Sequence, residues 1–344
     1  MEQSQGAIQL KRGRQKPVKN RHPWIFSGAI NKVQGTPQPG DVVDVLSNDG
    51  QWLAKAYYNP HSQIRARILS WDSKQDIDDD WWDNRLRAAL AYRNALEITD
   101  RTDAYRLVNA EADRLPGLVV DKYGPYLVLQ ALTYGIDRRK DLLVSLLKQM
   151  MNPAGIVERS DVDVREKEGL SSARGMLAGS EPPAGLTMHE NGQLFRVDLL
   201  SGHKTGLYLD QRDNRALLAQ PRFSHDRSVL NVFSYTGGFA LHAIAGGARA
   251  VTNIDSSADV LSAAQANVKQ NFGIRPQDEY LNGDAFTLLR TFRDAAKKFG
   301  AVVLDPPKFA HSQRDVQPAA RGYKDLNWLA FRLLEPGGIL ATFS

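Results

Sequence analysis

The residues best suited to chemistry in this chain follow one another at the ends of apolar runs in its last third. The run VLNVF (229–233) opens into a turn with two adjacent glycines, and glycine lets a ligand approach the backbone closely. The next run ends in Asp255, eighteen positions after Gly237, a spacing at which an acid commonly accepts hydrogen bonds from ribose hydroxyls. A third run ends in Asp284 and Ala285, an acid and a small residue that can bind an exocyclic amine such as adenine N6.

Together, these three run ends predict a site for an adenosine-type cofactor. The first of them supplies the candidates Phe233, Ser234, Tyr235, Thr236 and Gly237. Each feature also has a simpler explanation when it is considered alone, because a glycine pair makes a tight turn and an acid after a strand caps the next helix. The turn is neither G-x-G-x-x-G nor G-x-x-x-x-G-K-[ST], so an NAD site and a triphosphate-binding loop lose their main support.

The segment LDPPKF (304–309) is the sharpest local signal in the sequence. Its two prolines fix φ and remove two backbone donors, which holds the neighbouring carbonyls open and rigid. The carboxylate of Asp305 beside them can accept a hydrogen bond from an amino group or a protonated ring nitrogen. We expect this segment to grip a planar nucleobase next to a methyl donor, through Asp305, Pro306, Pro307 and Lys308. The alternative is a proline-stiffened loop with a capping Asp.

The segment SGHKTGLYLDQRDNR (201–215) gathers polar residues at one helical start, which we expect near Asp210. One interpretation is that this turn closes over the donor, so that Gln211 or Arg212 contacts the cofactor or a substrate phosphate. The other is that these residues only cap the helix and form surface ion pairs.

A basic segment at the N-terminus contains no acidic residue from Gln3 to Gly40. Its cations stand among aromatic residues: Lys11, Arg12, Arg14, Lys16, Lys19, Arg21 and Lys32, with His22, Trp24 and Phe26. Single-stranded nucleic acid offers phosphates to neutralise and bases to stack, so this mixture predicts RNA binding, chiefly by Lys11, Arg12, Arg14, Arg21 and Trp24. A solvated basic face is the simpler alternative.

Three regions are expected to position these residues. In residues 1–75, GDVVDVLSNDGQWLAKAYYNP holds two strand-like runs joined by an Asn48-Asp49-Gly50 turn, and SQIRARIL alternates as a third, which indicates a small β-barrel. An acidic linker (72–80) leads into a central α+β region, residues 76–200, with helices over 81–97 and roughly 136–151. No catalytic constellation stands out there, and we assign its charged residues to strand faces and surface pairs: Arg159, Asp161, Asp163 and Arg165.

Residues 201–344 alternate strands with helices, which is typical of a parallel doubly wound sheet. The expected strands cover 228–233, 250–255, 279–284, 301–307 and the closing run ILATF (339–343). In such a sheet, ligands bind at the carboxyl ends of the strands, where the candidate residues fall.

Composition excludes several classes of protein. The 344 residues are 42% hydrophobic and 24% charged, with a net charge of +5, as in ordinary globular proteins. No apolar run is long enough to span a membrane, and the N-terminus does not resemble a secretory signal. The chain has no cysteine, which excludes disulfides and thiolate metal sites within it and fits a cytoplasmic location. No metal site is predicted.

The motifs together resemble one family. HPWIFSGAI, HKTGLYLDQRDNR, NVFSYTGGFALHA, VLDPPKF, RGYKDLN and LLEPGGILATFS, in order along residues 8–344, look like the bacterial S-adenosylmethionine-dependent 23S rRNA cytosine-5 methyltransferases with an N-terminal PUA domain. The resemblance implies an α/β protein with a PUA RNA-binding barrel, a central α+β domain and a class I (Rossmann-like) methyltransferase domain. It also implies S-adenosylmethionine as cofactor and a 23S rRNA cytosine as substrate, with no membrane partner, and it leaves a homodimer open.

By this resemblance, residues 233–238 form the donor loop, Asp255 holds the ribose, Asp284 lies by the adenine and Asp305 grips the target base. The family chemistry also needs a cysteine, because carbon 5 of cytosine becomes nucleophilic only after a thiolate adds at carbon 6. In the family that cysteine follows a TFS stretch like the one that ends this chain. We therefore expect the methyltransferase domain to be truncated after its fifth strand, with the nucleophile just beyond Ser344 and the 344-residue chain inactive.

Two other functions stay open. Asp-Pro-Pro sites also serve nitrogen methylation of guanine or adenine, which needs no cysteine. Lys308 stands where adenine-amine methyltransferases usually have an aromatic residue, which counts against adenine. A non-catalytic RNA-binding assembly factor that retains the fold is the alternative from another class.

Overall fold

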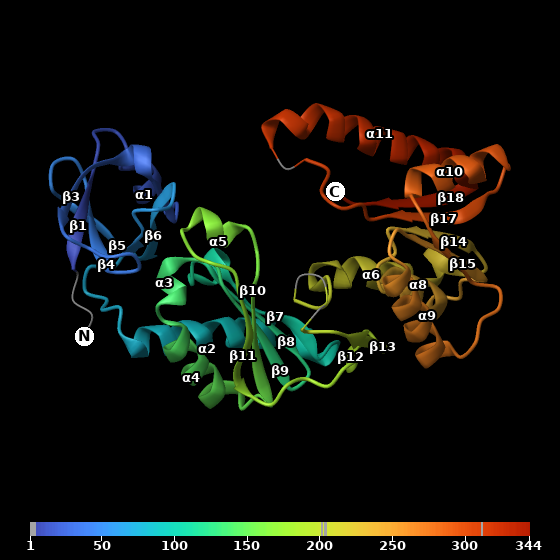
Figure 1. Ribbon diagram of the computed structural model, residues 1–344, viewed down its shortest axis with the longest axis horizontal. Helices are drawn as coiled ribbons and strands as arrows, with labels where there is room; N and C mark the ends of the chain where they lie inside the picture. The colour runs from blue at the N-terminus through green and yellow to red at the C-terminus, as the bar shows by residue number, and fades with distance from the viewer. Residues whose placement is uncertain (1–4, 201, 203–204, 311) are drawn as a thin grey trace. The chain divides into compact units, whose positions relative to one another are not determined.

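A computed structural model describes residues 5–200, 202, 205–310 and 312–344 (Figure 1). The chain divides into two compact units. Unit 1 comprises residues 1–188 and 197–207, and unit 2 comprises residues 189–196 and 208–344. Within the described residues, none of the helices is long and apolar enough to cross a membrane.

The first sheet of unit 1 has six strands in the order β2-β6-β5-β4-β1-β3. The strands are β1 (Gly6–Leu10), β2 (Trp24–Phe26), β3 (Ile30–Gly35), β4 (Val42–Leu46), β5 (Trp52–Tyr58) and β6 (Ile64–Ser70), with the short helix α1 (Lys16–Lys19) between β1 and β2. Neighbours pair antiparallel except β1 and β4, which are parallel. The predicted Asn48-Asp49-Gly50 turn joins β4 to β5, and Gly50 adopts a φ of 85° there. The three strands predicted in this region are confirmed as β4, β5 and β6.

The second sheet of unit 1 has five strands in the order β11-β10-β9-β8-β7. They are β7 (Ala104–Asn109), β8 (Leu118–Tyr123), β9 (Tyr126–Ala131), β10 (Gly155–Ser160) and β11 (Ala173–Gly179). The accompanying helices are α2 (Asp79–Ala95), α3 (Tyr134–Asp137), α4 (Lys140–Met151) and α5 (Val164–Lys167). Asp78 caps α2 by accepting a hydrogen bond from the Trp81 N–H at 2.9 Å. The helices α2 and α4 pack on the sheet through apolar side chains such as Trp82, Leu86 and Leu143.

Two expectations for this region were wrong. The helix predicted over roughly 136–151 is interrupted at residues 138–139, where the buried Arg139 donates hydrogen bonds to the Gly40 and Gly135 carbonyls. The charged residues of the following segment are not all at the surface. Arg159 and Arg165 are 7% and 3% exposed, because Arg159 pairs with Asp161 and Arg165 pairs with Asp137. Each also donates to backbone carbonyls, which replaces the hydrogen bonds it loses with water.

A two-stranded hairpin follows, formed by β12 (Leu186–Glu190) and β13 (Gln193–Val197). Asn191 and Gly192 connect its strands with φ values of 49° and 81°, the left-handed pair that a tight hairpin turn requires.

The sheet of unit 2 has five parallel strands in the order β16-β15-β14-β17-β18. They are β14 (Ser228–Val232), β15 (Ala250–Asp255), β16 (Glu279–Asn282), β17 (Phe299–Leu304) and β18 (Leu334–Thr342). The helices are α6 (Arg212–Leu218), α7 (Pro221–Ser224), α8 (Gly238–Ala245), α9 (Ala258–Phe272), α10 (Ala285–Asp294) and α11 (Val316–Leu333). Every predicted strand of this region is confirmed, and β18 lies at an edge.

Helices cover both faces of this sheet (Figure 1). The helices α10 and α11 pack on the face that carries Leu230, Val302 and Leu304, whereas α8 packs near Val303 on the other face. Strand order reverses at β14, whose two neighbours are β15 and β17. The carboxyl ends of β14 and β17 therefore flank the switch point at which ligands bind in open parallel sheets.

Candidate functional site

The loop from β14 into α8 has an unusual backbone. Phe233, Tyr235 and Gly237 all adopt left-handed φ values, of 60°, 46° and 82°. For the two aromatic residues, this conformation costs on the order of 1–3 kcal/mol each, and such strain is concentrated at functional sites. Gly237 also has little room for a side chain, because a Cβ there would lie 3.0 Å from the Cβ of Ala264.

Asp255, at the end of β15, holds this loop in place. Its Oδ2 accepts a hydrogen bond from the Tyr235 N–H at 2.9 Å, and its Oδ1 accepts from the Ser257 N–H at 3.1 Å. The N-cap of helix α9 is Ser257 rather than Asp255, so the simpler explanation for this acid, that it caps the helix, does not apply. The Asp255 carboxylate is half-buried and keeps free acceptor capacity at the loop.

Asp284 does act as a helix cap. Its Oδ2 accepts hydrogen bonds from the N–H and the hydroxyl of Thr287, both at 2.8 Å, and its side chain is exposed. The neighbouring turn is tied to the end of β15, because the Gly283 N–H donates to the Asp255 carbonyl at 3.1 Å. Ala285 is 6% exposed at the start of α10. That Asp284 and Ala285 contact an adenine stays a prediction.

The structure brings together two residues that are 94 positions apart. The Gln211 side-chain amide, at the start of α6, donates to Oδ1 of Asp305 at 3.2 Å, and its oxygen accepts from Asn214 at 2.7 Å. Arg212 instead contacts Asp213, at 3.3 Å. Three more residues of the predicted turn, Ser201, His203 and Lys204, lie outside the described residues.

Tyr208 is a site residue that sequence reasoning missed. Its ring meets that of Tyr235 edge to face, with centroids 5.5 Å apart. Burial raises the pKa of Tyr208, and the carboxylates of Asp305, Asp210 and Asp255 raise it further. The phenol therefore stays protonated and can donate a hydrogen bond among these carboxylates. No local pattern marks this tyrosine, because its role depends on acids from three separate segments.

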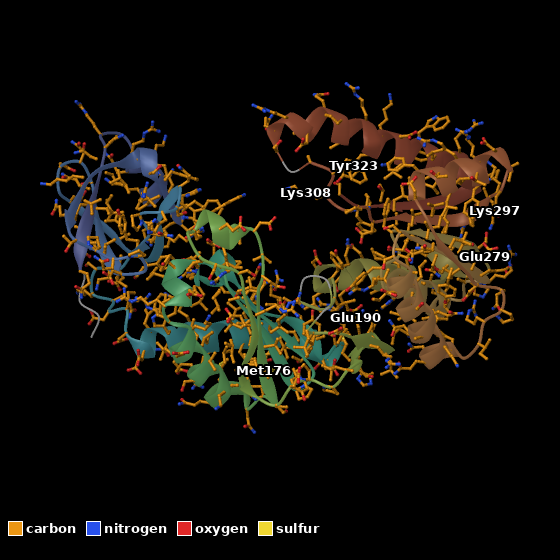
Figure 2. The ribbon with its side chains drawn as sticks, viewed as in Figure 1. Met176, Glu190, Glu279, Lys297, Lys308 and Tyr323 are labelled. Atoms are coloured by element: carbon orange, nitrogen blue, oxygen red, sulfur yellow. The ribbon has the colours of Figure 1, made fainter. Side chains whose placement is uncertain are left out.

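The Asp-Pro-Pro loop after β17 is held from helix α11. Figure 2 labels Tyr323 on α11 and Lys308 in this loop. The Tyr323 hydroxyl donates to the Pro307 carbonyl at 3.3 Å, and its ring packs against Phe309 with centroids 4.6 Å apart. The carbonyl of Pro307 is thus partly occupied, whereas the Lys308 side chain is exposed. The loop is fixed on one side by aromatic packing and by the Tyr323 hydroxyl.

A buried ion pair supports the site from within unit 2. The Glu190 carboxylate accepts from Nε and Nη2 of Arg215, both at 2.7 Å, and the two side chains are 0% and 3% exposed. Nη1 of Arg215 donates to the Tyr208 carbonyl at 2.9 Å. A Cβ on Gly238 would lie 2.8 Å from Cδ of Arg215, so the end of the loop after β14 packs directly on this arginine. Sequence reasoning missed this pair as well, since Glu190 and Arg215 are 25 positions apart.

The buried His242 on helix α8 is expected to make the stability of the fold depend on pH. Burial lowers its pKa and Arg215 adds to the lowering, although Glu190 and a hydrogen bond to the Gly238 carbonyl act in the opposite direction. Below about pH 6.5 the imidazole binds a proton in the unfolded chain but not in the folded chain. The free energy of unfolding is therefore highest above that pH and decreases as the pH falls. We expect His242→Asn to remove this loss, which is at most about 1.4 kcal/mol per pH unit. Urea unfolding of both proteins at several pH values tests it, and equal pH slopes would contradict it.

The basic residues of the N-terminal segment are exposed as expected: Lys11, Arg12, Arg14 and Arg21. Trp24 is half-buried. Its indole N–H donates to Glu111 at 2.7 Å, and the Arg67 guanidinium lies over its ring, 5.5 Å from the centroid. Part of the Trp24 ring is therefore already covered by protein. RNA contact by these residues stays a prediction.

The loop chemistry fits an adenosine-type methyl donor. The buried Ser234 hydroxyl has no hydrogen-bond partner among the described residues, an arrangement that costs about 1–3 kcal/mol unless a ligand supplies one. Asp255 offers a carboxylate beside it, and Gly237 keeps the backbone free of side-chain atoms. Among the residues that the structure describes, no group of His, Asp and Glu side chains could hold a metal ion.

Comparison with known proteins identifies the family. Residues 151–343, more than half of the chain, match the family model described as S-adenosylmethionine-dependent methyltransferase. The chain belongs to this family. It is therefore an enzyme whose cofactor is S-adenosylmethionine, as predicted. Residues 8–71 match the model of a PUA-like domain, which confirms that expectation for the N-terminal sheet. The methyltransferase match begins ahead of residue 201, and the division into domains at residues 75 and 200 stays a prediction.

Full-length relatives and solved structures agree with this assignment. Ribosomal RNA large subunit methyltransferase I of Aliivibrio fischeri strain MJ11 is 46% identical over 98% of this chain and 85% of its own length. The protein of that name from Klebsiella pneumoniae strain 342 is 45% identical over 97% and 83%. A candidate methyltransferase crystallised with S-adenosylhomocysteine (SAH) superposes with a TM-score of 0.83 at 23% identity, over 98% of this chain and 86% of that one. This last likeness shows the shared fold.

Proposed function

We propose that this enzyme transfers a methyl group from S-adenosylmethionine to carbon 5 of a cytosine in 23S ribosomal RNA. The observation that carries the proposal is the position of Asp305, at the end of β17 beside the switch point and hydrogen-bonded to Gln211. The two named relatives act, by their names, on large-subunit ribosomal RNA. The choice of carbon 5 of cytosine rests on the resemblance described from the sequence.

Each group of residues has one task in this proposal. The cofactor supplies an activated methyl group when it is bound. Asp255 accepts from the ribose hydroxyls, Ser234 pairs with a polar group of the cofactor, and Asp284 and Ala285 lie by its adenine. Asp305 accepts a hydrogen bond from the N4 amino group of the cytosine and orients the N3–N4 edge of the base as charge builds there during thiolate addition. Gln211 fixes the orientation of Asp305, and Pro306, Pro307 and Lys308 border the target base.

Methylation of carbon 5 also requires a nucleophile. A thiolate adds at carbon 6, carbon 5 then attacks the methyl group, and loss of the carbon-5 proton allows the thiolate to leave. The 344 residues contain no cysteine, so in this proposal the thiolate comes from outside them. Lys11, Arg12, Arg14, Arg21 and Trp24 bind the RNA strand, with Arg212 near a substrate phosphate.

We expect Asp305→Asn to lower the rate of methyl transfer by about 100- to 1,000-fold, the usual effect of removing one electrostatic contact to the transition state. Binding of SAH should change little, because Asp305 faces the base rather than the ribose. Labelled donor and 23S rRNA report the transfer in a form of the enzyme that includes the cysteine, and calorimetry reports SAH binding. Asp294→Asn, an exposed acid at the end of α10, is the matched control. An Asp305→Asn enzyme that methylates at the normal rate would contradict the proposed role.

Nitrogen methylation of a guanine or adenine is the second candidate. The absence of cysteine from the 344 residues favours it, since transfer to an amino nitrogen needs no thiolate. Mass spectrometry of nucleosides from methylated rRNA separates the two candidates. The proposal requires 5-methylcytidine, and methylguanosine or methyladenosine as the only product would overturn it.

A further inference from the structure

Unit 1 contains a cavity that lies outside the candidate methyl-transfer site. Its volume is about 650 Å³, within the range of small-molecule sites. Residues from the N-terminal sheet and from the central region line it together, among them Arg21, Trp71, Arg85, Glu111 and Arg114. Arg85 belongs to helix α2, and Arg114 follows β7.

The charges around this cavity do not balance. In the described part of the chain, no ion pair joins Arg21, Arg85 or Arg114 to a carboxylate. Burial lowers the pKa of Arg85, and the nearby positive charge of Arg114 lowers it further, because like charges repel. Such groups gain most from an anion placed between them.

Within the ranges that the structure describes, only one of the two acids in the wall is paired with a cation. Oε1 of Glu111 accepts from Nη1 of Arg67 at 2.8 Å and from the Trp24 indole at 2.7 Å. Asp72 is exposed and accepts from the Lys74 backbone N–H at 2.9 Å, so its charge offsets one of the three arginines. The cavity therefore presents an excess of positive charge to a ligand.

Two of the three arginines lie on strained backbone. Arg21 and Arg114 have left-handed φ values of 64° and 59°, which glycine or asparagine would adopt at lower cost. Strain of this kind is enriched at binding and active sites, and it also occurs elsewhere in this chain, as at Glu97. Both strained arginines line the same cavity.

Arg21 also connects this cavity to a second hollow. That hollow, of about 760 Å³, is lined by Arg14, Lys16, Arg21 and His22 of the basic segment, with Pro23 shared by both. The Arg21 guanidinium lies over the Trp71 ring, 5.2 Å from its centroid. Cations thus continue from the basic segment past an aromatic ring to Arg85 and Arg114, a combination of groups with which proteins bind single-stranded nucleic acid.

We propose that this cavity binds the phosphodiester backbone of a single-stranded RNA segment, with Arg85 and Arg114 on its phosphates and Trp71 beside a base. The inference rests on the proposed function, since it extends the RNA path of a ribosomal RNA methyltransferase from the PUA-like domain onto the central region. An acidic protein segment would also meet the charge, but it would leave Trp71 and the hollow beside it without a role.

The test compares RNA binding by three proteins: the unsubstituted chain, Arg85→Gln/Arg114→Gln, and Arg87→Gln. Arg87 lies on the same helix, is exposed, pairs with Asp83 at 2.6 Å and is absent from the cavity wall. Fluorescence anisotropy with a labelled single-stranded RNA of about 12 nucleotides gives the affinity at several salt concentrations. We expect the double variant to bind about 10-fold or more weakly and its salt slope to fall by about 1.4, or 0.7 per lost phosphate contact.

Further measurements separate the possible outcomes. Equal RNA affinity and equal salt slope in all three proteins would overturn the inference. It would also be overturned if cytidine monophosphate or an acidic peptide bound the unsubstituted chain as tightly as the RNA does and this binding were lost in the double variant. Unchanged SAH binding and Tm show that the variant is folded, and Arg114→Gln alone, at an exposed position, repeats the test with less risk. If Lys11→Gln/Arg12→Gln weakens RNA binding and the double variant does not, this inference fails and the proposed function stands. If the double variant loses RNA binding but a form of the enzyme that includes the cysteine methylates no 23S rRNA, the proposed function fails instead.

Discussion

Replacing Asp255 by alanine is expected to weaken SAH binding by about 100-fold. The substitution removes the acceptor of the Tyr235 N–H and the predicted acceptor of the ribose hydroxyls. Hydrogen bonds to a charged group contribute about 1.5–3 kcal/mol each, and 2.7 kcal/mol corresponds to about 100-fold in affinity. The strained φ at Tyr235 adds to the effect, because the loop relaxes when its anchor is lost.

Calorimetry with SAH measures this prediction, and two variants sharpen it. Asp255→Asn keeps one acceptor oxygen and should lose only about 10-fold, since it loses the charge but retains the shape. Asp259→Ala removes an exposed acid from the first turn of the neighbouring helix α9 and should bind SAH normally. If Asp255→Ala bound SAH within twofold of the unsubstituted chain, the loop after β14 would not be the donor site.

The parts of unit 2 that could be predicted from the sequence are those with local causes. The predicted runs of five to seven residues all became parallel strands, and most of them ended in polar groups. Because the carboxyl ends of parallel strands share one edge of a sheet, the loop at 233–238, Asp255 and Asp305 could be assigned to one site before their geometry was known. The contact between Gln211 and Asp305 was not foreseen, although each residue was selected separately.

The features of the site that could not be predicted from the sequence depend on contacts between distant segments. Tyr208 owes its raised pKa to burial and to acids from three elements, and Arg215 finds Glu190 across a hairpin. Arg159 and Arg165 were placed at the surface because charged residues usually lie there, and only the fold supplies the carbonyls that make their burial possible. Asp284 shows the reverse case, in which a residue chosen for binding also performs the simpler role of a helix cap.

Glu190→Gln is expected to destabilise the folded state by about 3 kcal/mol or more. The change leaves Arg215 charged and 3% exposed without its carboxylate, and breaking a buried pair in this way typically costs 3–5 kcal/mol. Because Arg215 also holds the Tyr208 carbonyl and packs on Gly238, the donor loop should loosen as well. We therefore expect weaker SAH binding in addition to lower stability, measured by urea unfolding and by calorimetry.

The pair between Glu279 and Lys297 provides the matched control (Figure 2). It is as short as the buried pair, at 2.7 Å, but its side chains are 48% and 35% exposed, so solvent screens the two charges. Glu279→Gln should cost no more than about 1 kcal/mol and should leave SAH binding unchanged. Equal losses in the two variants would mean that Arg215 finds another partner or water when Glu190 is removed. In that case, the burial of the Glu190–Arg215 pair would not explain how the loop after β14 is held in place.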